Sequence, residues 1–366
     1  MLRIHRIIRI KLMRRLAGLA IPLIFAAFPA LALAWGAQGH EQVGAIADKL
    51  IAGSPAEKWV AHLLGGMNLQ TASVWADCAK AVKSNDDINF TYQANPRRTE
   101  CAPFSGPEAA RQFESFVARN WKQCGSAHGS EYCGNQYHYA DISVLHDHYA
   151  PGYVGANNHD IVHAIDAAIA VLRGRAPDAP FSIADRQEAL LLLAHYVGDI
   201  HQPLHVAALY LDADGRIIDP EPLGYQPGHD TAGGNNIIDG KKSLHAEWDA
   251  IPPALEIGGE QDAALLQLAK SIPPTPGDLS AWSTAWATDS IRASRPVFAD
   301  LQFSMRTGME TIDKNNNKNA DRPERWDVTG VDAAYQSRAD RIKFQQLAKA
   351  GARLAQVLKA VWPDGS

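Results

Sequence analysis

The chain has 366 residues, 46% of them apolar, with 35 Lys and Arg against 40 Asp and Glu. This balance excludes a disordered acidic tail and a basic protein that coats nucleic acid, and it allows a sizeable core. All the acidic residues follow residue 34, and removal of the first 34 residues leaves 29 basic and 40 acidic side chains, a net charge of −11.

Residues 1–34 have the pattern of a secretory signal peptide. Basic residues up to Arg15 precede an apolar stretch, which ends in Ala-Leu-Ala, the small-residue pattern that signal peptidase recognises. An uncleaved anchor is the alternative, because the apolar stretch is about as long as the ~18 to 20 residues of a membrane span. Cleavage predicts a mature chain that begins at Trp35, is exported to a periplasm or secreted, and has no stable membrane association.

Four cysteines lie close together in the sequence: Cys78, Cys101, Cys124 and Cys133. An oxidising compartment would pair them, and three pairings are possible. The most local pairing joins Cys78 to Cys101 and Cys124 to Cys133. A zinc site built from the four thiolates is the alternative, although the sequence contains no C-x-x-C motif.

Helical periodicity dominates the mature chain, with apolar residues at i, i+3, i+4 and i+7 near residues 43–50, 161–172 and 347–361. Strand-like alternation is scarce. We therefore predict an all-α fold in which residues 35–366 form a single large domain. Long loops are expected at about 84–108, 120–136, 211–243 and 311–330.

The clearest helix start is Ser182, a predicted N-cap with an acidic residue three positions later. This helix would place His195 and Asp199, at i and i+4, on one face about a turn apart. Gly198 would keep that face open. Pro203 would end the helix, so that His205 comes from the turn just beyond.

The same spacing recurs at His245 and Asp249. A single pair of this kind is more often a solvated ion pair than a metal site, but the recurrence favours metal, and His with carboxylate ligands suits Zn²⁺. A cluster of several ions needs a bridging carboxylate, and Asp199, with His195 and His205 on either side of it in the sequence, is the candidate.

Five motifs together resemble the S1/P1 nuclease family, whose members are single-strand-specific nucleases with three zinc ions. They occur in the family's order and span about two thirds of the mature chain. The motifs are WGAQGH (35–40), VWAD (74–77), YHYAD (137–141), HYVGDIHQPLH (195–205) and GGN followed by SLHAEWD (233–235 and 243–249).

The resemblance implies three zinc sites in a helical fold shared with zinc phospholipase C. The first would use the amino group and carbonyl oxygen of Trp35, with His40 and Asp199. The second would use Asp77, His138, His195 and Asp199, and the third His205, His245 and Asp249. An α-amine can bind metal once its proton is displaced, whereas an extra residue before Trp35 would turn it into an amide, which cannot.

The resemblance also implies a zinc-dependent endonuclease that hydrolyses single-stranded DNA and RNA to 5′-phosphate ends, with 3′-nucleotidase activity. Asp199 would be catalytic as the bridging ligand, and Lys80 would steady phosphoryl charge. Tyr139, Asp141 and Asn235 would bind substrate. A base can stack on Tyr139 only when it is unpaired, which gives the single-strand preference a physical cause.

Two departures and two alternatives accompany this prediction. Residues 78–133 form a cysteine-containing insertion that is long for the family and is a candidate lid, and the loop before GGN is also long. A zinc phospholipase C is one alternative, although that pattern ends in His-x-x-x-Glu where this chain has Asp249. The other alternative is an exported zinc-binding protein without catalytic activity.

Overall fold

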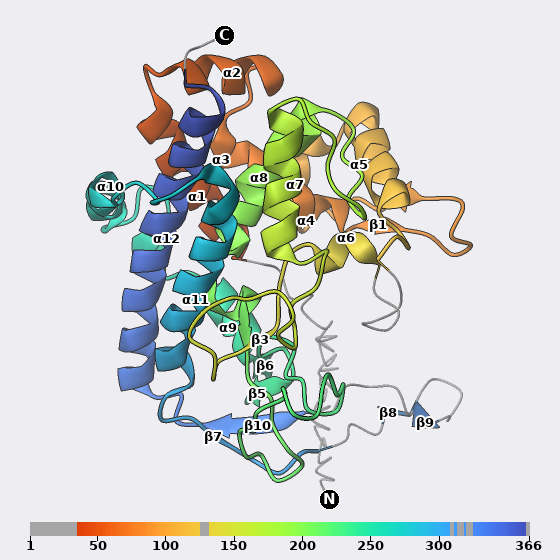
Figure 1. Ribbon diagram of the computed structural model, residues 1–366, viewed down its shortest axis with the longest axis vertical. Coiled ribbons are helices and arrows are strands. Elements are labelled where there is room, and N and C mark those ends of the chain that lie inside the picture. The colour runs from red at the N-terminus through yellow and green to blue at the C-terminus, as the bar shows by residue number, and fades with distance from the viewer. Residues whose placement is uncertain (1–34, 125–131, 308–310, 313–317, 320–324, 364–366) are drawn as a thin grey trace, which may run out of the picture. The chain divides into compact units, whose positions relative to one another are not determined.

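The computed structural model describes residues 35–124, 132–307, 311–312, 318–319 and 325–363. The predicted signal peptide, residues 1–34, lies outside the described residues. The described residues group into one compact unit. Twelve α-helices and only short strands occur in the described part of this unit, which confirms the all-α prediction (Figure 1).

Helix α8 (Arg186–Asp199) lies at the centre of the helical layer, and nearly all of its side chains are buried. Its neighbours are six helices whose apolar faces cover it. They are α1 (Ala37–Ile51), α2 (Pro55–Leu63), α3 (Leu69–Ala72), α4 (Trp75–Ala79), α7 (Ile161–Leu172) and α12 (Ala333–Val361). Because α8 is buried all round beyond its first turn, its sequence there is mostly apolar on every face apart from the residues of the site.

The pairing of α1 with α12 follows the predicted apolar periodicity. Val43, Ile46 and Ala47 are buried on the inner face of α1. A Cβ atom at Gly351 of α12 would lie 2.4 Å from Cγ2 of Ile46, so the two helices approach as closely as they do only because residue 351 is glycine.

The predicted N-cap of α8 is wrong by three residues. Asp185, not Ser182, caps the helix: its side chain accepts a hydrogen bond from the backbone N–H of Glu188, 2.8 Å away. Glu188 in turn accepts from the backbone N–H of Ala184. The chain carries two acid-containing cap patterns in succession, and Asp185 and Glu188 together satisfy two of the free N–H groups at the helix start.

The remaining helices lie around this layer. They are α5 (Pro107–Arg119), α6 (Cys133–Gln136), α9 (Leu244–Asp249), α10 (Asp262–Ser271) and α11 (Trp282–Phe298), with 3-10 turns η1 (Thr99–Phe104), η2 (Pro203–His205), η3 (Pro253–Leu255) and η4 (Leu279–Ala281). None of the helices in the described ranges has the length and apolar character needed to cross a membrane.

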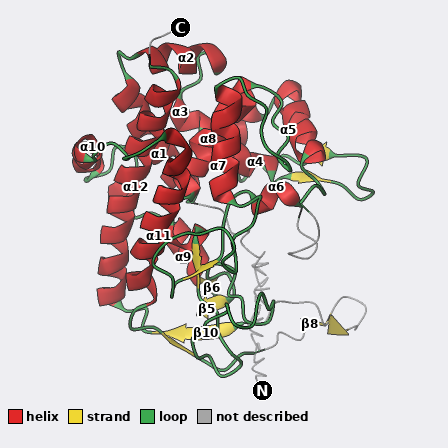
Figure 2. Cartoon of the chain, viewed as in Figure 1, coloured by secondary structure: helices red, strands yellow, loops and turns green. Residues whose placement is uncertain are grey.

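A small four-stranded sheet, in the order β6-β5-β10-β7, was not predicted; Figure 2 shows it at the bottom of the view, below the helices. Its strands are β5 (Ile237–Asp239), β6 (Lys242–Ser243), β7 (Gln302–Phe303) and β10 (Trp326–Thr329). Strands β5 and β10 are parallel, with Trp326 opposite Ile237, and the other two pairs are antiparallel. Strands β8 (Thr311–Ile312) and β9 (Lys318–Asn319) pair separately.

A parallel pair of two-residue strands joins two ligand-bearing segments. Strand β3 (Ile142–Ser143) pairs with β4 (Ala207–Ala208), and the backbone N–H of Ala140 donates to the carbonyl oxygen of His205. These contacts place the segment after His138 beside the segment after His205, although 67 positions separate the two histidines.

The cysteine-containing insertion packs against α4. Its described elements include the hairpin of β1 (Val82–Lys83) and β2 (Thr91–Tyr92), and α5, whose Phe113 lies 5.1 Å from Trp75 of α4 between ring centroids. Disulfides join Cys78 to Cys101 and Cys124 to Cys133, the most local of the three possible pairings. Two disulfides fit an exported protein, because disulfides persist in oxidising compartments.

Candidate metal centre

Three groups of His and Asp side chains are close enough within each group to hold a metal ion. In each, the candidate ligand atoms lie within 4.8 Å of one another. The groups are His40, Asp77 and His195; His138, His195 and Asp199; and His205, His245 and Asp249. The structure thus brings together all eight of the predicted His and Asp ligands.

Asp199 belongs to the second group and also faces His40 of the first, whereas the motifs predicted His40 with Trp35 and Asp199 rather than with Asp77 and His195. Its Oδ2 atom is 3.1 Å from Nε2 of His195, one turn earlier on α8, and 2.9 Å from Nδ1 of His138. Its Oδ1 atom is 3.1 Å from Nε2 of His40 on α1. Asp77 on α4 is the remaining candidate ligand near Asp199, and its Oδ1 atom lies 3.7 Å from Nε2 of His195. One carboxylate therefore faces imidazoles from three separate elements, as a bridging ligand must.

The third group combines α9 with η2. Nε2 of His245 lies 3.5 Å from Oδ2 of Asp249, one turn later on α9, and 3.2 Å from Nε2 of His205. His205 and Asp249 are farther apart, at 3.9 Å between Nε2 and Oδ1. We refer to this third set as the α9 group.

Backbone carbonyl groups fix the rings of three of the histidines. Nδ1 of His195 lies 2.7 Å from the carbonyl oxygen of Ser73, and Nδ1 of His205 lies 2.8 Å from that of His138. Nδ1 of His245 lies 2.8 Å from the carbonyl oxygen of Gly233. Because a carbonyl oxygen only accepts, each Nδ1 carries the proton and each Nε2 presents a lone pair to its group, the arrangement typical of metal-binding histidines.

Two glycines make room for these contacts. A Cβ atom at Gly198 would lie 2.7 Å from Nδ1 of His40, so the open helix face predicted at Gly198 is the surface on which the His40 ring rests. Gly233 has a φ of +58°, and a Cβ atom there would lie 2.2 Å from the carbonyl oxygen of Leu204. Only glycine adopts this conformation in so little space while its own carbonyl group reaches His245.

Trp35 lies between the α9 group and the helix turn that carries His40. Its side chain is fully buried, and a Cβ atom at Gly39 would lie 2.8 Å from the Trp35 Cβ atom. The next residue, Gly36, donates its backbone N–H to the carbonyl oxygen of Asp249 over 2.7 Å. The start of the predicted mature chain is thus held between α9 and the first turn of α1, which carries His40.

Burial and neighbouring charge give the three Asp residues different pKa values. Burial alone would raise the pKa of Asp199 and Asp77, but His195 holds the pKa of Asp199 well below its usual range, and Lys80 lowers that of Asp77. Burial raises the pKa of Asp249 well above its usual range, opposed by the hydrogen bond from Gln202 and reinforced by the charges of Asp77 and Asp199.

Most of the imidazoles are held neutral. Burial, with the nearby charge of His195, lowers the pKa of His40 to about 4. Burial lowers the pKa of His138 and of His245 to about 3, with further lowering by Lys80 and by His205 respectively. Neutral imidazole is the form that binds metal, so protons compete little for these three ligands near neutral pH.

The chemistry of the unpaired atoms fits a set of cations. Several buried ligand atoms form no well-directed hydrogen bond to any described residue: both ring nitrogens of His40, Oδ1 of Asp77, Oδ1 of Asp199 and Oδ2 of Asp249. Among them, Oδ1 of Asp77 has an ion pair with Lys80, and Nε2 of His40 and Oδ1 of Asp199 face each other. Buried polar atoms without partners are costly, and buried carboxylates most of all. Divalent metal ions would satisfy all of them at once, so the residues present fit the zinc ions that the motifs imply.

Other predicted residues lie around the centre. Nζ of Lys80 is 2.8 Å from Oδ1 of Asp77. Tyr139 is partly exposed, while Asp141 is buried, and its carbonyl oxygen accepts from the Tyr210 hydroxyl. Nδ2 of Asn235 donates to the carbonyl oxygen of Ala232. No ligand contact tests the predicted substrate roles of Tyr139, Asp141 and Asn235.

Sequence reasoning missed the residues that brace the ligands. Arg98 of the insertion donates through Nη1 to the carbonyl oxygen of Asp77, 3.0 Å away. Lys343 of α12 donates to the carbonyl oxygens of Glu247 and Ala250, on either side of Asp249. Neither residue lies in a motif or at a helical spacing from its partner, so no local signal in the sequence could have identified them.

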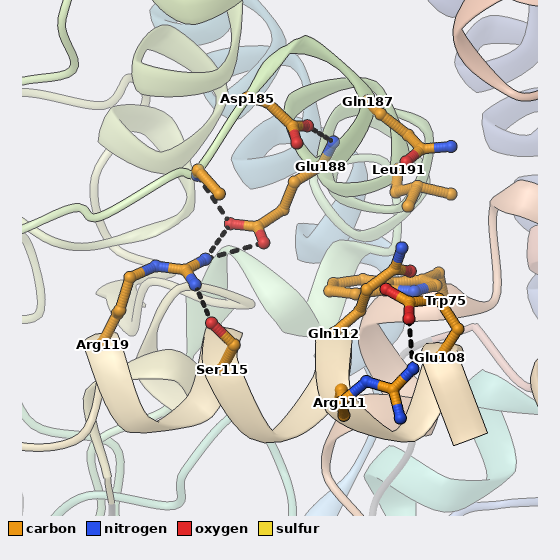
Figure 3. Close-up of a pocket in the computed structure, with 11 residues that line it drawn as sticks. Trp75, Glu108, Arg111, Gln112, Ser115, Arg119, Asp185, Gln187, Glu188 and Leu191 are labelled. Carbon is orange, nitrogen blue, oxygen red and sulfur yellow. Dashed lines mark hydrogen bonds and ion pairs between the residues drawn. The ribbon is translucent and has the colours of Figure 1, made fainter.

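A separate hollow between α5 and the start of α8 has no ligand set of this kind (Figure 3). Nη2 of Arg119 lies 2.6 and 2.7 Å from the two carboxylate oxygens of Glu188, and Arg111 pairs with Glu108. Both carboxylates are thus paired with a guanidinium, and no histidine lines the hollow. The unsatisfied ligand atoms instead belong to His40, Asp77, Asp199 and Asp249.

Comparison with known proteins agrees with this geometry. The family model described as S1/P1 nuclease matches residues 35–362, nearly the whole of the described chain. Nuclease PA3 from a Penicillium species is 30% identical over 126 residues, which are 33% of this chain and 39% of the fungal protein. The chain belongs to the S1/P1 nuclease family.

Proposed function

We propose that the protein is a zinc-dependent endonuclease that hydrolyses single-stranded DNA and RNA to 5′-phosphate ends and also removes the phosphate from nucleoside 3′-monophosphates. Family membership supports nuclease activity in general. The observation that carries the finer proposal is Asp199, a buried carboxylate that faces His40, His138 and His195 at hydrogen-bonding distance.

Three ions would be held by the residues of the three groups, with Trp35 added through its amine and carbonyl oxygen. His40 and Asp199 would join Trp35 in one site, and Asp77, His138 and His195 would join Asp199 in the second. The α9 group would supply the third. Zinc in such sites polarises phosphoryl oxygens and activates water near neutral pH.

The side chains of this protein would orient the substrate and balance its charge. In the hydrolysis the water oxygen bonds to phosphorus and the water gives up a proton, while the bond from phosphorus to the 3′ oxygen breaks and the 3′ oxygen takes up a proton. Lys80, held against Asp77, places a positive charge beside the reacting phosphoryl group. Because Lys lacks the fork of Arg, it supplies charge without bidentate contact.

Local charge explains how an acidic protein can bind a polyanion. The charge of three divalent ions would exceed that of the three Asp ligands, so the centre is cationic although the chain without residues 1–34 is strongly acidic. Few Lys or Arg would neutralise phosphates, so binding should depend only modestly on salt.

Tyr139 would stack on an unpaired base, with Asp141 and Asn235 beside it, and the insertion 78–133 would cover the substrate as a lid.

The proposal is tested with zinc-loaded protein that begins at Trp35, compared with a version that carries one extra residue before Trp35. We expect the first protein to cleave single-stranded DNA and the second to lose most of this activity and one zinc ion, because an amide nitrogen cannot replace the amine. Short-chain phosphatidylcholine is assayed in parallel. Cleavage of the lipid alone would contradict the nuclease proposal, and bound zinc without hydrolysis of any phosphodiester would indicate a zinc-binding protein.

A further inference from the structure

Gln202 is a buried polar residue that connects two of the ligand-bearing elements. It lies in the turn between α8 and η2, three residues before His205, and its side chain is fully buried. A buried amide is costly unless both of its ends are hydrogen-bonded. Both ends of Gln202 have partners, and the partners belong to different parts of the centre.

The two contacts fix the orientation of the amide. Oε1 of Gln202 accepts a hydrogen bond from the backbone N–H of Leu204, 2.6 Å away. Because a backbone N–H only donates, the amide oxygen must face Leu204, and the NH₂ group must face the other way. There, Nε2 donates to Oδ1 of Asp249 over 2.7 Å.

The second contact determines which oxygen of Asp249 is free. Oδ1 is occupied by Gln202, whereas Oδ2 forms no hydrogen bond to any described residue and lies 3.5 Å from Nε2 of His245. A carboxylate without the Gln202 contact could rotate about its Cβ–Cγ bond. The amide therefore holds the carboxylate plane and presents Oδ2 to the imidazole.

The first contact acts on His205. The Leu204 bond caps η2, and the backbone N–H of His205 donates to the carbonyl oxygen of Gln202 over 2.9 Å. Gln202 thus fixes two things: the turn that carries His205, and the carboxylate of Asp249. Asp249 lies 44 positions after His205 along the chain.

We propose that Gln202 is the positioning residue of the α9 group, which aligns Asp249 with His205 and His245 so that the three hold one divalent metal ion. The inference rests on the proposed function only in that this group binds zinc. Partners of this kind typically change metal affinity by about 10- to 100-fold when they are replaced.

The test compares Gln202→Met with Gln346→Met in zinc-loaded protein that begins at Trp35. Gln346 of α12 is equally buried, but neither end of its amide has a hydrogen-bond partner among the described residues, so it controls for loss of a buried amide. Bound zinc is counted by elemental analysis, and affinities are measured by competition with a chelator. We expect Gln202→Met to bind one of three ions about 10- to 100-fold more weakly and Gln346→Met to match the unchanged protein.

A second variant, Gln202→Glu, keeps an acceptor for Leu204 but replaces the donor that faces Asp249, and we expect the same single-ion loss. Unchanged affinity for all three ions in both Gln202 variants would overturn the positioning role while leaving the proposed function intact. If the unchanged protein already binds no ion at the α9 group, the proposed three-ion site fails instead. Thermal melting of the zinc-free proteins identifies a variant that does not fold.

Discussion

The two His-x-x-x-Asp pairs have the same spacing and the same local chemistry, yet their surroundings differ. In both helices Nδ1 of the histidine is bonded to a carbonyl oxygen, so that Nε2 faces the other ligands of its group. Helix α8 has 14 residues and lies inside a layer of six helices. Helix α9 has six residues and follows directly from strand β6.

Different contacts therefore hold the two His and Asp pairs in position. The α8 pair is positioned by the packing of a long buried helix. The α9 pair depends on individual polar contacts: Gln202 to the Asp249 side chain, Gly36 to its carbonyl oxygen, and Lys343 to the carbonyl groups on either side. One sequence pattern is thus supported in two ways, by a long helix buried among six others or by a short helix with two buried anchors, Leu244 and Trp248, and a set of separate hydrogen bonds.

The charges differ as well. The imidazoles around Asp199 oppose the effect of burial and hold its pKa well below the usual range. Asp249 has fewer such neighbours, and burial together with the charges of Asp77 and Asp199 raises its pKa well above the usual range. Equal spacing on a helix therefore does not predict equal ionisation.

The largest effect is expected for Asp199→Asn. This change removes the carboxylate that two sites would share, so we expect loss of at least two zinc ions and a fall in single-stranded DNA cleavage of more than about 100-fold. Zinc content and initial rates measure the effect. Asp166→Asn, at a mostly buried Asp that accepts from Ser283 outside the three groups, is the control. Three ions and a full rate in Asp199→Asn would exclude a bridging role.

A smaller effect is expected for Asp249→Asn. Because only the α9 group uses this carboxylate, the variant should lose one ion and keep the two that depend on Asp199. The rate should fall by roughly 10- to 100-fold, less than in Asp199→Asn. Elemental analysis of the two variants side by side makes the measurement, and equal zinc losses would show that the two pairs form one indivisible cluster.

The opposite pKa shifts predict opposite effects on the stability of the metal-free protein. The lowered pKa of Asp199 contributes stability that is present above the unfolded value of 3.8 and is lost as the pH falls through the folded value. The raised pKa of Asp249 contributes stability that is present below 3.8 and is lost as the pH rises through the folded value.

At pH 7, after removal of metal, Asp199→Asn should therefore lower the free energy of unfolding by at least about 1 kcal/mol. Asp249→Asn should leave it unchanged or raise it, and its relative benefit should shrink as the pH is lowered toward 4. Urea unfolding of chelator-treated proteins at several pH values measures both effects. The same sign for both variants at pH 7 would contradict the electrostatic difference between the pairs.

The smallest effects concern the helix caps. Ser243 caps α9 by accepting from the N–H of Ala246, and Asp185 caps α8. Replacement of either residue by Ala should cost about 1 kcal/mol of stability, as measured by urea unfolding of the zinc-loaded protein. Only Ser243→Ala should also weaken zinc binding, because α9 has six residues, so its cap fixes a larger share of the helix than the cap of the 14-residue α8 does. A matching loss of zinc in Asp185→Ala would remove this distinction.

The parts of the molecule that could be predicted from the sequence are those in which the signal is local. The spacing of His195 and Asp199, and the open face at Gly198, depend on one helix, and the structure shows both. Even there the cap was misplaced at Ser182, because two adjacent segments carry similar cap patterns and only packing chooses between them.

Contacts between segments that are far apart in the chain could not be predicted, because neither segment carries a sequence pattern that points to the other. The parallel pairing of Trp326 with Ile237 joins residues far apart in the sequence, and its strands are too short to show alternation. Gln202 lies inside a motif, but its role depends on Asp249, which arrives from another helix. The family resemblance predicted a grouping of the ligands that spacing alone could not give, and the structure brings the same eight His and Asp side chains together but places His40 with Asp77 and His195.

The central claim is that Asp199 serves two metal ions and Asp249 serves one. The most direct measurement is a crystal structure of zinc-loaded protein beginning at Trp35, with anomalous scattering recorded at the zinc absorption edge. We expect three zinc peaks, two of them within about 2.0 to 2.2 Å of Asp199 oxygens and the third at the same distance from Asp249. A single ion at Asp199, or an α9 group without zinc at saturating concentration, would contradict the claim.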